Sequence, residues 1–118
     1  MSISDVIILF LEEDMDLKIL YTSQYLKSLN EDLYFYARNE DVDNVYYLGM
    51  IYLKKLYELD YIRGESEDRL LDIRIAMVIN DAREDIKFMK SKLKTATQTK
   101  DFLDFMLDET DYFINDVK

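Results

Sequence analysis

Histidine, cysteine, proline and tryptophan are all absent from the 118-residue sequence, and glycine occurs only at Gly49 and Gly64. Without histidine or cysteine, the chain lacks the most common general base and the thiol nucleophile. The same absence removes zinc–thiolate sites and the Glu-x-x-His motif of helical di-iron proteins, and no glycine-rich loop is present to bind a phosphate. Two carboxylates can still catalyse hydrolysis, as in glycosidases. The sequence nevertheless favours a protein that is not an enzyme and that binds neither a cofactor nor a metal ion.

The shortage of glycine and proline also bears on the fold. β-Sheet proteins need many tight turns, and those turns draw on both residues. A chain with two glycines and no proline has few turns, and therefore a few long elements. Hydrophobic residues make up 49% of the chain, which is enough for a core, and a chain of this length suits one domain. We predict an all-α fold in which residues 1–118 form a single compact antiparallel bundle of four to five helices.

The apolar pattern divides the chain into five helical segments. They cover Ser4–Glu13, Met15–Arg38, Val45–Ile62, Ser66–Leu93 and Lys100–Val117. A buried strand competes with the helix over the apolar run Val6–Leu11, because periodicity cannot separate the two over six residues.

Two of these segments carry long apolar stripes that we expect to face the core. In the second segment the stripe consists of Leu17, Tyr21, Tyr25, Leu29, Leu33 and Tyr36. The fourth segment carries the most regular stripe, which consists of Leu71, Ile75, Val78, Ala82, Ile86, Met89 and Leu93.

Polar residues mark the expected helix ends. The connector 39–44 offers an N-cap at Asp43 or Asn44, since short polar side chains accept a hydrogen bond from the first turn. Gly64 ends the third segment because glycine readily takes the left-handed conformation after a helix. Ser66 then caps the fourth segment.

The balance of charge restricts the partner. Fifteen lysines and arginines against 25 acids give a net charge of −10, which opposes direct binding to nucleic-acid phosphates or to an anionic membrane. The run Val6–Leu11 is far shorter than the ~20 apolar residues of a membrane span, and acids follow it. We expect a cytoplasmic protein whose partner is a protein with a basic surface. Abundant Ile, Asn, Asp, Lys and Tyr suggests the AT-rich genome of a virus, phage or plasmid, which would place it in the host-cell cytoplasm.

A line of acids runs along the last segment. Asp101, Asp104, Asp108 and Asp111 follow one another at three, four and three residues, so they share one side of a helix. The rise between neighbours is roughly 4.5–6 Å, close to the spacing of phosphates along a nucleic acid. Small acidic helical proteins of this kind can occupy the nucleic-acid groove of a DNA-binding enzyme, and small phage inhibitors of restriction and CRISPR systems include such mimics. A solvated helix face without a partner is the alternative.

Tyrosine is concentrated in one part of the chain. Nine of the ten tyrosines lie between Tyr21 and Tyr61, more than one inward stripe can hold. Tyr46 and Tyr47 are adjacent and point about 100° apart. Exposed tyrosines are typical of interfaces. We take Tyr34, Tyr36, Tyr46 and Tyr47 as candidates for a partner surface or a homodimer, against the alternative that they line the core boundary.

These features lead to two hypotheses of function. The first is a non-enzymatic acidic helical protein that binds and occludes a basic macromolecular partner, including the case of viral or phage counter-defence by nucleic-acid mimicry. The second is a small structural protein that acts through its own oligomer.

Overall fold

The computed structural model describes residues 3–65, 67–93 and 97–115, with side chains for 17–65, 67–93 and 98–113. Four helices account for almost all of these residues: α1 (Ile3–Arg38), α2 (Val42–Glu65), α3 (Arg69–Lys92) and α4 (Thr97–Asn115). The described ranges contain no strand, so the all-α class is confirmed. The run Val6–Leu11 is helical. It lies in one continuous α1 that joins the first two expected segments, because no glycine or proline interrupts the residues between them.

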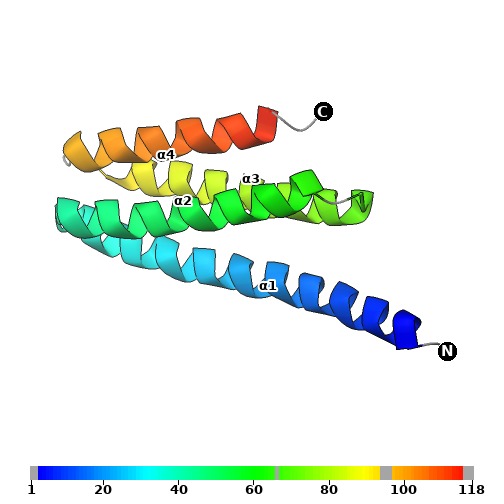
Figure 1. Cartoon of the computed structure of the whole chain (residues 1–118). Helices are drawn as coiled ribbons and strands as arrows, with labels where there is room; N and C mark the ends of the chain where they lie inside the picture. The colour runs from blue at the N-terminus through cyan, green and yellow to red at the C-terminus, as the bar shows by residue number, and fades with distance from the viewer. Residues whose placement is uncertain (1–2, 66, 94–96, 116–118) are drawn as a thin grey trace.

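The helices form an elongated bundle in which α2 and α3 lie between α1 and α4 (Figure 1). Successive helices run in opposite directions, and α1 and α4 each pack against both middle helices. The 36 residues of α1 are about 54 Å long, whereas each middle helix has 24 residues. Towards its N-terminus α1 diverges from the bundle and extends past the other helices (Figure 1), and the longest dimension of the molecule is 60 Å.

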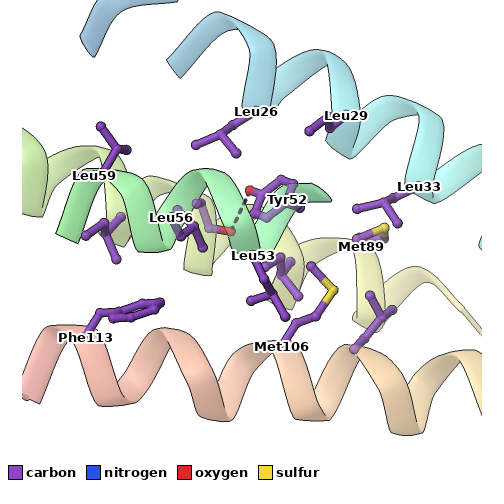
Figure 2. Close-up of a cluster of buried hydrophobic side chains, with 14 of the residues drawn as sticks. Leu26, Leu29, Leu33, Tyr52, Leu53, Leu56, Leu59, Met89, Met106 and Phe113 are labelled. Carbon is purple, nitrogen blue, oxygen red and sulfur yellow. Dashed lines mark hydrogen bonds between the residues drawn. The ribbon is translucent and has the colours of Figure 1, made fainter. Parts of the chain in front are cut away.

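A single cluster of buried apolar side chains draws on all four helices (Figure 2). The α3 stripe predicted from sequence is part of it, with five residues buried and Leu71 and Val78 partly buried. In the middle of the cluster the buried Tyr52 hydroxyl donates a hydrogen bond of 3.5 Å to the Ala82 carbonyl, which links α2 to α3. The predicted α1 stripe is half wrong: Leu29 and Leu33 are buried, but Leu17, Tyr21 and Tyr25 are exposed.

The turn between α1 and α2 is closed by backbone hydrogen bonds of the Schellman type. The Asp41 N–H donates to the Tyr36 carbonyl and the Glu40 N–H to the Ala37 carbonyl. This places Glu40 in the left-handed position, with φ of 59°. Asp41 is then the N-cap of α2, since its carboxylate accepts from the Asn44 N–H at 3.3 Å. The predicted caps Asp43 and Asn44 are wrong, because both lie inside the helix.

The end of α2 also differs from the prediction. The helix continues through Gly64 to Glu65, and Gly64 keeps a helical backbone. Ser66 lies outside the described residues, and the N-cap of α3 is Asp68, whose carboxylate accepts from the Leu70 and Leu71 N–H groups. No helix in the described part of the chain is both long enough and apolar enough to cross a bilayer.

Candidate interaction surface on α2 and α4

The predicted acidic face of α4 divides into two pairs. Asp104 forms an ion pair with Lys90, and Asp111 forms one with Arg83, both across the seam with α3. Asp101 and Asp108 are exposed on the outside of the helix. The four acids cover a sector of about 80° around the helix axis, and the edge of that sector meets α3. Two of the acids therefore stabilise the packing of α3 on α4, and two remain available to a partner.

The exposed acids alternate with exposed rings. Phe105 is 47% exposed and Tyr112 is 65% exposed. Together with Asp101 and Asp108 they follow at four, three and four residues, which places all four on one line along the helix. We call this line the outer stripe of α4. It extends for about 16 Å along the axis. Neither ring was predicted from the sequence, although their spacing to the two acids was the signal that points to them.

At the N-terminal end of the stripe, rings continue across to α2. The Phe105 ring stacks on Phe102 with centroids 6.0 Å apart, and Phe102 meets Tyr46 of α2 at 4.6 Å. Tyr46 and Phe105 are exposed and Phe102 is half-buried. We call these three residues the first ring row.

The C-terminal end of the stripe has the same arrangement. Tyr112 meets Phe113 edge-on at 6.2 Å, and Phe113 meets Tyr57 of α2 edge-on at 4.8 Å. Phe113 is buried, so its ring supports Tyr57 and Tyr112 from below. We call these three residues the second ring row. It lies 11 residues beyond the first on α2, a distance of about 16 Å.

A glycine in α2 allows the first ring row to form. Gly49 is buried, and a Cβ at this position would lie 2.2 Å from Cε1 of Phe102 and 3.2 Å from Sδ of Met106. Any side chain here would collide with the ring unless the ring moved. The mid-helix glycine therefore lets α4 approach α2 closely and seats the Phe102 ring in the seam.

A hydrogen bond between the two helices orders the second ring row. The Tyr57 hydroxyl donates to the Glu109 carboxylate. This bond raises the pKa of Tyr57 to about 12, because ionisation would place two negative charges side by side. At neutral pH the hydroxyl keeps its proton, and its bond to Glu109 ties Tyr57 to α4 although the residue is 46% exposed.

The four predicted tyrosines have different surroundings. Tyr34 and Tyr36 pack against the core cluster, and the Arg38 guanidinium lies over the Tyr34 ring at 5.5 Å. Tyr46 belongs to the first ring row. Tyr47 is exposed on α2 beside it. Only Tyr46 of the four thus takes part in the surface formed by the ring rows and the outer stripe.

A small polar cavity of about 10 Å³ lies between α1, α2 and α3. Lys27, Asp81, Asp85 and the Tyr52 side chain line it. Burial raises the pKa of Asp85, Lys27 lowers it and Asp81 raises it. A space of this size holds about one water molecule. In the described ranges no three acidic residues are placed to hold a metal ion.

We compared the chain with protein-family models, with curated proteins and with solved structures. None matches. What the protein does must therefore be inferred from its own surface. The most developed surface among the described residues is the one on α2 and α4, because it combines two rows of rings with carboxylates that lie between and beside them.

Proposed function

We propose that this chain is a non-enzymatic binding protein that docks a basic segment of a protein partner on the surface of α2 and α4 and so occludes it. One observation carries the proposal: exposed carboxylates and exposed rings alternate along the outer stripe of α4. A helix face that meets only solvent would not require exposed rings, and a purely hydrophobic interface would not require carboxylates between them. The expected place of action is the cytoplasm.

Arginine suits this arrangement better than any other side chain. Its planar guanidinium stacks on an aromatic face and pairs with a carboxylate at the same time. Two rings of this chain already have a lysine ammonium group over them. Nζ of Lys55 lies 5.7 Å from the centroid of the Tyr25 ring, and Nζ of Lys92 lies 4.9 Å from that of Phe88. The net charge of −10 would attract a basic partner from a distance.

The spacing of the exposed acids favours this form of binding over close imitation of a phosphate backbone. Asp101 and Asp108 are seven residues apart, about 10 Å along the helix, which is wider than the roughly 4.5–6 Å between neighbours in the complete line of four acids that the comparison with phosphates requires. The other acids of α4 have partners on neighbouring helices: Asp104 and Asp111 pair with α3, and Glu109 accepts a hydrogen bond from Tyr57 of α2. A basic helix with arginines two turns apart matches the outer stripe.

The test uses a short arginine-rich peptide as a defined probe. Titration of the ¹⁵N-labelled protein, followed by backbone amide shifts, should move signals of α2 and α4 rather than those of α1. Reversal of the two exposed acids, Asp101→Lys with Asp108→Lys, should abolish binding, and loss of the two rings, Phe105→Ala with Tyr112→Ala, should weaken it about tenfold. Binding should also weaken as salt rises.

A matched control separates the surface from overall charge. Glu31→Lys with Asp32→Lys reverses two exposed acids of α1, at the opposite side of the bundle, and changes the net charge by the same amount. This control should keep most of the peptide affinity. Equal loss in both charge variants, or shifts spread evenly over all four helices, would show that the peptide senses only net charge and would refute the assignment of the site.

A further inference from the structure

The α2 half of the proposed binding surface differs in charge from the α4 half. Val45–Tyr57, the part of α2 that spans both ring rows, contains two lysines and no acid, although the whole chain carries a net charge of −10. Lys55 lies over the Tyr25 ring, on the side of α1. Lys54 is exposed and lies about 200° around the helix from the buried Tyr52, so it points away from the core. The exposed charge is therefore negative on α4 and positive on α2.

The contacts of the two ring rows fix the register between α2 and α4, which run in the same direction (Figure 1). Both rows pair a residue of α2 with the residue 56 positions later on α4, since Tyr46 meets Phe102 and Tyr57 meets Phe113. Lys54 is then level with the second half of the outer stripe, about 3 Å beyond the second of its two acids. The axes of packed helices lie about 8–10 Å apart. Because both charges point outward, the positive edge and the negative edge are separated by roughly one helix diameter.

The strip between these two edges is apolar. Met50 is 56% exposed between the ring rows on α2, and Phe105 is 47% exposed on α4. Within the described part of the chain Lys54 has no ion pair, and the acid one turn away, Glu58, pairs with Lys55 at 3.4 Å. The surface thus offers a partner helix an apolar strip with an available cation on one edge and available carboxylates on the other.

We infer that the surface of α2 and α4 takes an amphipathic helix whose two polar edges carry opposite charges. Arginines about 10 Å apart on one edge face Asp101 and Asp108, and an acid on the other edge faces Lys54. This inference rests on the proposed function and adds the chemistry that selects the partner. Complementary charges fix the orientation of a bound partner, and a helix laid in the reverse direction would bring its acid against the carboxylates of α4. A uniformly basic helix would meet Lys54 with like charge. A second copy of α2 could not supply the acid, because Val45–Tyr57 contains none.

Two designed helical peptides test the inference on the full chain. Both carry leucines along the central strip and two arginines, about two turns apart, on one edge. They differ at one position on the other edge, which is glutamate in the acid-edged peptide and glutamine in the amide-edged peptide. Isothermal titration calorimetry at about 0.15 M salt, where the screening length is about 8 Å, measures the dissociation constant of each. Lys54→Gln should weaken binding of the acid-edged peptide about threefold and should not weaken binding of the amide-edged peptide.

Lys18→Gln is the matched control, because it removes one exposed lysine from α1 and changes the net charge by the same amount. It should change the affinity for the two peptides by the same factor. An equal effect of Lys54→Gln on both peptides, or an equally large difference between the peptides with Lys18→Gln, would overturn the inference. The proposed function would still stand in that case if Asp101→Lys with Asp108→Lys abolished binding of both peptides. If that double reversal left binding unchanged, the proposed function would fail, and this inference with it.

Discussion

Gly49 packs closely against Phe102, so the effect of Gly49→Ala on the free energy of unfolding depends on whether the Phe102 ring is present. In an unconstrained helix interior, alanine is more stable than glycine by about 1 kcal/mol. At position 49 the new methyl group would meet Cε1 of Phe102 at 2.2 Å and Cζ at 2.9 Å. Overpacking of this kind costs about 1–3 kcal/mol. The half-buried ring can escape only by leaving its contacts with Tyr46 and Phe105, which are worth about 0.5–1.5 kcal/mol each. We expect Gly49→Ala to destabilise the protein by about 1 kcal/mol.

Removing the Phe102 ring should reverse the sign of the stability change caused by Gly49→Ala. In a Phe102→Leu background the methyl group has room, so Gly49→Ala should stabilise by about 1 kcal/mol. Urea unfolding followed by circular dichroism measures both effects, provided that the dependence on urea keeps its slope. Gly64→Ala is the control: nothing lies within 4 Å of the place that a methyl group would take there, so alanine should stabilise the helix by several tenths of a kcal/mol up to about 1 kcal/mol. Stabilisation by Gly49→Ala in the wild-type background would refute the close packing of α2 on α4.

Two further predictions concern the α1–α2 turn and the second ring row. Glu40 is held at a φ of 59°, so Glu40→Gly should stabilise the protein by about 0.5–1 kcal/mol in thermal unfolding. The relief of left-handed strain outweighs the added freedom of the unfolded chain. Glu40→Ala should bring no such gain. Because the folded-state pKa of Tyr57 is raised to about 12, the stability that its bond to Glu109 contributes is complete below the ordinary tyrosine pKa and is lost as pH rises through about 12. Glu109→Gln should lower that pKa towards the ordinary value, as read by ultraviolet titration against a Tyr57→Phe reference, and an unchanged titration curve would argue against the hydrogen bond.

The fold class followed from the sequence because glycine and proline are scarce, but the choice of buried face in α1 did not. The predicted stripe stepped by four residues from Leu17 to Leu33, and each step of four advances 40° beyond a full turn. Over four steps the stripe drifts by about 160°, from the outer side of the helix to the core. The buried residues Ile19, Leu26 and Leu33 instead repeat at seven, with a drift of only about 20° per step.

The helix caps could not be placed from sequence for a related reason. The stretch before and at the start of α2 contains Asn39, Asp41, Asp43 and Asn44, and each residue type is a good N-cap. Asp41 was selected because the backbone of α1 closes through Glu40 in the left-handed position, and this fixes where α2 begins. That conformation is unusual for glutamate, so the residue type does not predict it.

The sequence indicated the acids of the candidate site but not its aromatic rings. Sequence spacing grouped four acids of α4 correctly on one side of the helix, yet it cannot show which edge of that side meets a neighbour. Packing of α3 takes Asp104 and Asp111 for ion pairs with Lys90 and Arg83. The rings of Phe105 and Tyr112 were overlooked because the sequence does not show which apolar residues of an amphipathic helix stay exposed after it packs.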